Sequence, residues 1–378
     1  MRRFLTPVLA LVLTLPAFAG KDRIFKKGDP KPLEGTIEKE DLKEVAIKLE
    51  GSASSSVTWD KVASIEYGDE PLALKDAKGT MAKGDKEGAS EMFAKAAEGL
   101  KEKPLFLAHA LYYRALCLQQ SGKFDDAIRG YDDLIKTLPS CRFFKEMHEN
   151  RISCFLAKND SKGAADAIAA ASTAAKDQNV DQPFQILMNL KEAEVLEAGG
   201  DTAQAKGKFL AVSMQAGSKY AEISGMAKLG AARCELKSNA VAAQGIYESI
   251  TREFKGQRKV LGAAWTGLGD CLLQQGTKDG DLDKLRRAAL AFEQTVVLYF
   301  PGEGASTTAY EQALTGGGQA FLVLAQKATT DKARGLYAGQ ARSMALALID
   351  QFPSSVLKSK ADEIKNQADE ELAKVPKK

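Results

Sequence analysis

Residues 115–139 read ALCLQQSGKFDDAIRGYDDLIKTLP, and this stretch decides the fold. Ala115 and Ala127 are small residues on either side of a break at Gly122, and Tyr131 follows four positions after Ala127. Small residues let two helices approach closely, and an aromatic ring fills the space to the next structural unit. Pro139 ends the second helix because it lacks an N–H and clashes with the preceding turn. The stretch therefore predicts a helix–turn–helix unit.

The same pattern recurs along most of the chain. The small residue of each second helix can be followed through Ala89, Ala127, Ala164, Ala205, Ala243, Ala288 and Ala341. Aromatic residues follow in most units, at Phe93, Tyr131, Phe209, Tyr247 and Phe292. These positions predict seven units, of which the last two carry insertions at 276–283 and 327–334 that we expect to lengthen their turns.

This pattern resembles the tetratricopeptide repeat, a helix pair of roughly 34 residues that stacks into a solenoid. The resemblance implies a mainly α fold with seven helix pairs over residues 72–353. Residues 354–375 form an amphipathic stretch rich in Lys, Asp and Glu. We expect this stretch to be a capping helix, because a solenoid needs a polar outer face at its end.

Residues 21–70 do not follow the helical period. Short runs alternate between apolar and polar residues, as in Glu44–Leu49, and such alternation is typical of strands with one buried face. About five strands are expected, curled into a small β-barrel-like domain. This segment resembles the short β modules that precede repeat arrays in some bacterial envelope proteins.

The first 19 residues predict a secretory signal peptide. Arg2 and Arg3 precede a mostly apolar stretch of about a dozen residues, and Ala17-Phe18-Ala19 fits the small-x-small rule for cleavage after Ala19. We therefore expect an exported protein, periplasmic or secreted. No later stretch is apolar for the roughly 20 residues that a membrane span requires.

Charge and cysteine content narrow the possible roles. The formal charge is +3, from 53 basic and 50 acidic residues, so no net field attracts nucleic acid. Five cysteines cannot all be paired within one chain. Four of them follow the small residue of a first helix and are predicted to be buried packing residues, at 117, 154, 234 and 271. Cys141 follows Pro139 in a loop and is the candidate for a reactive or bridging thiol.

Motifs for chemistry are weak in this sequence. His109 and His148 have no second ligand at metal-binding spacing. Residues 279–283, DGDLD, begin like a calcium loop but lack its later Gly and Glu, so we expect Asp283 to cap a helix instead. Residues 316–318, three glycines, lie within a predicted helix and indicate a close helix crossing. We predict no enzyme, no metal and no cofactor.

Arrays of the resembled family bind an extended peptide or a helix in a groove lined by their first helices. By that analogy the groove would present the following side chains: His109, Tyr112, Leu116, Gln119, Glu146, Glu149, Ser153, Leu187, Leu190, Glu194, Thr266 and Asp270. The family's Lys, Asn and Arg clamp for a C-terminal carboxylate is missing. A mixed apolar and acidic groove favours a protein or peptide partner with apolar anchors and basic side chains.

Two classes of function remain open from the sequence. The first is a non-enzymatic protein–protein interaction scaffold of the bacterial envelope. The alternative is an accessory protein associated with cell wall or glycan, in which the β module binds the glycan and the repeats recruit an enzyme. The alternative requires an exposed aromatic or basic surface on the β module, and it fails if Phe25, Trp59 and Tyr67 are all buried.

Overall fold

The computed structural model describes residues 20–51, 53–301, 308–353 and 355–376. The predicted signal peptide lies outside these residues. Contacts within the chain define two compact units, Met1–Lys158 (unit 1) and Asn159–Lys378 (unit 2). None of the helices in the described part of the chain has the length and hydropathy that a membrane crossing requires.

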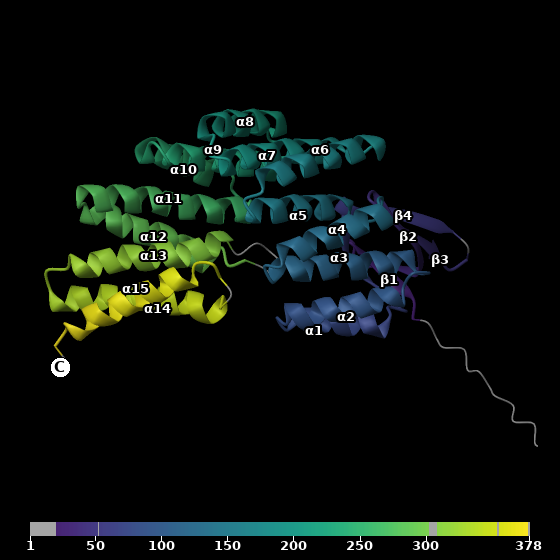
Figure 1. The fold of residues 1–378 in the computed structure, drawn as a ribbon, viewed down its shortest axis with the longest axis horizontal. Helices are drawn as coiled ribbons and strands as arrows, with labels where there is room; N and C mark the ends of the chain where they lie inside the picture. Colours follow the sequence, from purple (N-terminus) through teal and green to yellow (C-terminus); the bar gives the residue numbers. More distant parts are fainter. Residues whose placement is uncertain (1–19, 52, 302–307, 354, 377–378) are drawn as a thin grey trace, which may run out of the picture. The chain divides into compact units, whose positions relative to one another are not determined.

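Unit 1 begins with one antiparallel sheet, as the alternating pattern predicts (Figure 1). Its strands are β1 (Asp22–Lys26), β2 (Leu33–Glu40), β3 (Glu44–Leu49), β4 (Ser54–Thr58) and β5 (Val62–Glu66). Their order in the sheet is β4-β3-β2-β1-β5, so β4 and β5 lie at opposite edges. The expected number of strands is confirmed.

The expected closure into a barrel is wrong, because the two edge strands do not pair with each other. A small sheet must bury its apolar face against something. Here Ile24, Val45 and Ile47 form the centre of that face, and Leu105 of a following helix packs against it. Tyr67, just after β5, meets the ring of Phe106 edge-on at 5.6 Å. Two neighbouring residues of that helix, Leu105 and Phe106, thus pack where closure would have placed a strand.

The rest of the described chain is helical. Unit 1 contains α1 (Leu72–Ala82), α2 (Lys86–Glu98), α3 (Pro104–Gln120), α4 (Phe124–Thr137) and α5 (Phe144–Ala157). Unit 2 contains α6 (Ser161–Asp177), α7 (Gln182–Ala198), α8 (Thr202–Ala216), α9 (Ala221–Leu236), α10 (Ala240–Glu253), α11 (Arg258–Asp279), α12 (Leu282–Leu298), α13 (Thr308–Gln326), α14 (Asp331–Gln351) and α15 (Lys358–Ala373). Consecutive helices pack on each other within each unit (Figure 1). The described residues therefore contain fifteen helices in a repeat fold, the number that seven pairs and a final helix predict.

Aromatic residues and glycines join successive pairs. Phe209, Tyr247 and Phe292, on the second helices α8, α10 and α12, are each at most 2% exposed. Each ring lies against a glycine of the next first helix, where a Cβ would overlap it, and these glycines are Gly230, Gly267 and Gly316. A missing side chain on one helix therefore accommodates a large ring from its neighbour, which confirms the steric reading of the repeat. Gly316 serves this helix crossing, while Gly317 also meets Met344 of α14 and Gly318 lies against α14 and α15, so the three glycines allow close helix crossings, as expected.

The insertions change helix lengths more than turns. Residues 276–279 do not lengthen a turn but continue α11, which ends at Gly280 in the left-handed conformation. Asp281, not Asp283, caps α12, since its carboxylate accepts from the N–H groups of Asp283 and Lys284. The turn after α13 is confined to residues 327–330, because Thr330 caps α14. The two expectations about turn length, and the choice of Asp283 as cap, are therefore corrected.

All five cysteines are buried and free. The packing role of Cys117, Cys154, Cys234 and Cys271 is confirmed. Cys141 lies beside Asp41 of the sheet segment in an isolated antiparallel bridge, and burial raises the pKa of its thiol to about 11. A buried, protonated thiol is a poor nucleophile. The expectation that Cys141 is reactive or bridging therefore has no support in this structure.

Candidate functional site

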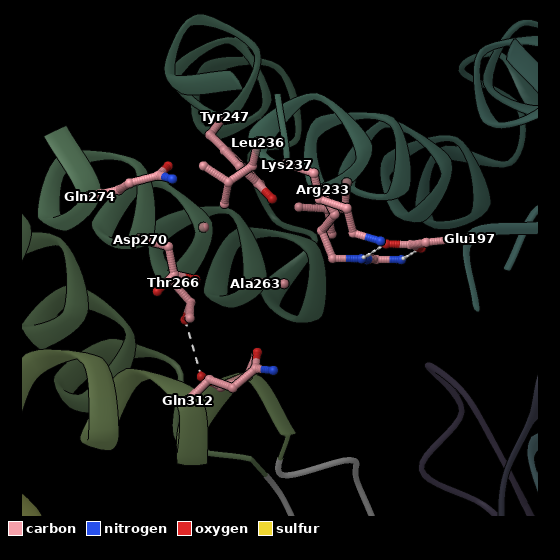
Figure 2. A pocket seen from close by; sticks show the side chains of 13 residues that line it. Glu197, Arg233, Leu236, Lys237, Tyr247, Ala263, Thr266, Asp270, Gln274 and Gln312 are labelled. Carbon is pink, nitrogen blue, oxygen red and sulfur yellow. Dashed lines mark hydrogen bonds and ion pairs between the residues drawn. The ribbon is translucent and has the colours of Figure 1, made fainter. Parts of the chain in front are cut away.

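The first helices of four successive pairs in unit 2 form a continuous layer. Helix α9 packs on α7 and on α11, and α11 packs on α13. This layer lines a cavity that is open to solvent (Figure 2). Its volume is about 490 Å³, which is within the usual range for ligand-binding sites. Its lining consists of Glu197, Leu229, Arg233, Leu236, Lys237, Tyr247, Ala263, Thr266, Gly267, Asp270, Gln274, Ala309 and Gln312. We call it the unit 2 cavity.

Helical periodicity explains why these residues share one surface. Residues four apart lie above one another on a helix. Thr266, Asp270 and Gln274 follow this spacing on α11, and Leu229 and Arg233 follow it on α9. Each helix therefore presents one stripe to the cavity, and the stripes carry both apolar and polar groups.

One wall of the cavity carries an ion pair between neighbouring first helices. The Arg233 side chain donates from Nε to Glu197 Oε1 at 3.1 Å and from a terminal nitrogen to Glu197 Oε2 at 2.7 Å (Figure 2). Burial would lower the pKa of Arg233, but Glu197 more than offsets this and the pKa is raised. Both carboxylate oxygens of Glu197 thus receive a hydrogen bond from one guanidinium, which is a strong bidentate arrangement.

Asp270 stands across the cavity without such a partner. No hydrogen bond or ion pair joins its partly buried carboxylate to another residue of the described chain. Burial raises the pKa of Asp270 to about 7, and the charge of Lys360 on α15 offsets only part of this effect. A carboxylate that is removed from water without compensation favours its neutral form. The cavity therefore contains one acidic side chain whose ionised form a positively charged partner would stabilise.

Tyr247 and Thr266 shape the floor. The Tyr247 ring reaches the cavity from α10 because Gly267 leaves space for it. Thr266 is 2% exposed, and its hydroxyl lies 3.0 Å from the Gly262 carbonyl and 3.1 Å from that of Ala309. The Thr266 hydroxyl therefore links α11 to α13, which fixes the cavity shape.

Comparison with known proteins finds similar solved structures and leaves the ligand open. No family model matches the chain, and no curated protein matches it. Among solved structures it is similar to a tetratricopeptide repeat protein from Parabacteroides merdae, with 17% identity over 78% of this chain and 97% of that one, at a TM-score of 0.48. It is also similar to pilF of Pseudomonas aeruginosa, with 14% identity over 71% of this chain and 99% of that one, at a TM-score of 0.39.

A third match is the TPR2AB domain of yeast Sti1 in complex with pHSP90. The identity is 11%, over 70% of this chain and 98% of that one, and the TM-score is 0.28. The fold resembles a tetratricopeptide repeat array. Identities and scores this low say nothing about what the chain binds.

Only some of the predicted groove residues of unit 2 line the cavity. Thr266 and Asp270 both line the unit 2 cavity. Leu190 is 1% exposed and belongs to the core, so it offers no surface to a ligand. Leu187 is partly buried against the same core. Glu194 binds Lys191 at 2.8 Å on its own helix. The part of the predicted groove on α7 thus does not reach this cavity.

The predicted unit 1 groove residues mostly make internal contacts. Tyr112 stacks on Phe143 at 4.1 Å and accepts from Asn150 at 3.3 Å. Gln119 accepts from the Tyr131 hydroxyl at 2.7 Å. The others differ in exposure: Leu116, Glu149 and Ser153 are partly buried, and Glu146 is exposed. Whether any of them contacts a partner stays a prediction.

His109 lies in a buried polar cluster between the sheet and α3. Its Nε2 is 3.1 Å from Glu40 Oε2, while its buried Nδ1 has no hydrogen-bond partner. Glu40 also accepts from Tyr67 at 2.5 Å and from Arg142 at 3.4 Å. Burial lowers the pKa of His109, so the neutral form donates from Nε2. We call Glu40, Tyr67, His109 and Arg142 the sheet–helix cluster.

Trp59 completes the attachment of the sheet. The guanidinium of Arg142 lies 4.5 Å from the centre of the Trp59 ring, and Trp59 Nε1 donates to the Asp41 carbonyl at 2.7 Å. Trp59 and Tyr67 are partly buried and bonded within the chain, and Phe25 is partly buried. These aromatics therefore do not supply the exposed aromatic surface of the glycan-binding alternative, and its exposed basic surface stays a prediction.

Sequence reasoning found Thr266 and Asp270 but missed the groups around them. Glu197, Arg233 and Asp270 occupy equivalent positions of three successive first helices, at intervals of 36 and 37 residues. That recurrence is visible in the sequence and would have found Glu197 and Arg233. The repeat pattern predicts only a packing role for Tyr247, and the structure shows that its ring also reaches the cavity.

Proposed function

We propose that this protein is a non-enzymatic interaction scaffold that binds a segment of a partner protein in the unit 2 cavity. The observation that carries the proposal is the open cavity lined by α7, α9, α11 and α13, where apolar side chains stand beside polar and charged groups. Such a combination is typical of binding sites, since apolar area supplies affinity and placed polar groups supply orientation.

We further propose that the protein acts in the bacterial envelope after export. The support is the sequence of residues 1–19, with its basic start, apolar stretch and small-x-small end. Amino-terminal sequencing of the protein from fractionated cells tests this directly. The expected mature chain begins at Gly20 and is found in the periplasmic or secreted fraction. An intact Met1 in the cytoplasmic fraction would contradict it.

Site-specific photo-crosslinking in living cells tests the binding proposal. A benzoylphenylalanine is placed at Gln274, an exposed residue at the cavity, and in a second variant at Met214, which lies on α8 and is 78% exposed. We expect a discrete adduct with one partner from position 274 and none of that adduct from position 214. The same adduct from both positions, or none from position 274, would contradict binding at the cavity.

A further inference from the structure

The charged side chains of the unit 2 cavity differ in whether they have an ion-pair partner. Arg233 and Glu197 neutralise each other through two hydrogen bonds. Lys237, at the end of α9, is exposed and can be hydrated without a partner. Asp270 is partly buried and has no partner within the described chain. Asp270 is therefore the charge of this site that neither a partner nor full hydration compensates.

The groups that face Asp270 do not supply a counter-charge at close range. Tyr247 on α10 is a neutral phenol whose pKa is raised by burial. The Arg233–Glu197 pair stands on α9 and α7, and α13 contributes the uncharged Gln312. Lys360 on α15 is exposed, and its charge offsets only part of the rise that burial causes in the pKa of Asp270. An unpaired carboxylate in such surroundings gains most from a cation brought by a ligand.

The wall beside Asp270 suits an aliphatic chain. Leu229, Leu236, Ala263 and the ring of Tyr247 form it, and none of these carries a charge. Lys and Arg side chains bury their methylene stems on apolar surface while their charged ends reach polar groups. The apolar wall and the carboxylate therefore match two ends of one kind of side chain.

We propose that Asp270 binds the lysine or arginine side chain of a partner peptide, whose stem packs on Leu229, Leu236 and Ala263. This inference rests on the proposed function and names the chemistry of its ligand. We do not expect a carboxylate or phosphate ligand beside Asp270. Arg233 is already paired with Glu197, and the negative charge of Asp270 would repel an anion.

Peptide selection followed by calorimetry tests the inference. The probe is a library of random dodecapeptides displayed on phage and selected on the purified mature protein. Selected peptides are then titrated against wild type, Asp270→Asn and the matched control Asp279→Asn. Asp279 is on the same helix but is bound to Lys284 outside the cavity.

We expect the selected peptides to share a basic residue. Asp270→Asn should weaken their binding by about tenfold to a hundredfold, since a charge-assisted hydrogen bond is lost. Asp279→Asn should leave the affinity unchanged. Replacing the basic residue by norleucine should weaken binding to wild type equally and should have little further effect on Asp270→Asn.

The pH dependence gives a second readout. A cation binds the ionised form of Asp270, so affinity should rise from pH 6 to pH 8 in wild type and stay flat in Asp270→Asn. Circular dichroism of each variant confirms that it is folded. An affinity that does not change with pH, or falls with rising pH, would overturn the inference.

Two blocking variants separate failure of the inference from failure of the proposed function. Ala263→Phe fills the cavity from α11, and Gln312→Trp does so from the exposed side of α13. Peptides that both variants exclude, but that lack a basic residue or bind Asp270→Asn equally, would overturn the inference and leave the scaffold proposal standing. No selected peptide, or peptides that bind both blocked variants, would overturn both.

Discussion

Asp270 connects the chemistry of the cavity to the stability of unit 2. Burial raises its pKa from 3.8 to about 7, so the folded state holds a proton that the unfolded state releases. Such an acid does not change the free energy of unfolding at a pH below its pKa in the unfolded chain. Above that pH it lowers the free energy of unfolding progressively, until the pH passes its pKa in the folded chain. Binding sites commonly retain groups that are unfavourable for the free protein.

Asp270→Asn should therefore stabilise unit 2, and the gain should grow from pH 4 to pH 7 and then level off. Because part of the carboxylate reaches solvent, we expect about 1–2 kcal/mol at pH 8. Urea denaturation at several pH values measures this. A gain that is largest at pH 4 would show that burial of the charge is not the cause.

Gly267 is a second residue whose change has a defined outcome. A Cβ at this position would overlap the Tyr247 ring, so Gly267→Ala must displace the ring or separate α10 from α11. We expect a loss of about 1–3 kcal/mol. Gly245→Ala on α10 is the matched control, because nothing lies within 4 Å of its added Cβ.

The control should instead stabilise the protein by about 0.5–1 kcal/mol, the usual gain in helix propensity. Thermal unfolding followed by circular dichroism compares the two. Equal shifts in the same direction would mean that the contact between Gly267 and Tyr247 does not limit the packing of these helices.

At the scale of elements, the sheet is held to the helices through the sheet–helix cluster. Glu40→Gln leaves Arg142 without its carboxylate and turns one acceptor of Tyr67 and His109 into an amide. The side chain of Glu40 is 2% exposed, so we expect a loss of about 3–5 kcal/mol from unit 1. Glu38→Gln, on the same strand but exposed, should change stability by less than about 0.5 kcal/mol.

Guanidinium denaturation of both variants checks this difference. A small effect of Glu40→Gln, similar to that of Glu38→Gln, would mean that the cluster does not fasten the sheet. Hydrogen exchange at the N–H groups of β2 and β3 gives an independent reading, because loosened strands lose protection before the helices do.

Local signals predicted the elements well, and they failed where a distant segment intervened. The alternation of apolar and polar residues predicts five strands, and the spacing of Ala127, Tyr131 and Pro139 predicts the helix pairs. Closure of the sheet was mispredicted because the covering residues, Leu105 and Phe106, belong to a helix far along the chain. The pattern predicts His109 as a groove residue, and this fails for the same reason, since its partner Glu40 lies 69 residues away.

The cavity shows the same limit. Thr266 and Asp270 follow from the periodicity of one helix, and the period of the repeat aligns Arg233 with Asp270. No sequence pattern reveals that Arg233 is neutralised by Glu197 while Asp270 is not. That distinction depends on side-chain geometry between helices, and it decides which charge a ligand must bring.

At the scale of the molecule, the two units should respond to pH in opposite directions. Burial lowers the pKa of His109 and of His148 in unit 1, so their contribution to stability is lost as the pH falls below about 6.5. In unit 2, Asp270 takes up a proton on folding, so stability rises as the pH falls from 7.5 to 5. The chain has two tryptophans, Trp59 in unit 1 and Trp265 in unit 2, which allows each unit to be followed separately.

Fluorescence of Trp265→Phe reports unit 1, and that of Trp59→Phe reports unit 2. We expect two distinct denaturation midpoints at pH 7.5. On acidification to pH 5 the first should fall and the second should rise. Coincident transitions that move together would show that the chain unfolds as one cooperative body.

The central claim is that a basic side chain of the partner meets Asp270 in the unit 2 cavity. A carbodiimide joins a carboxylate directly to a lysine amine without a spacer, so it reports contact between the two groups. The measurement is carbodiimide crosslinking of the mature protein to a selected lysine peptide, mapped by mass spectrometry. We predict an amide between that lysine and Asp270, absent from Asp270→Asn and retained in Asp279→Asn. Crosslinks confined to other carboxylates, unchanged in Asp270→Asn, would contradict the claim.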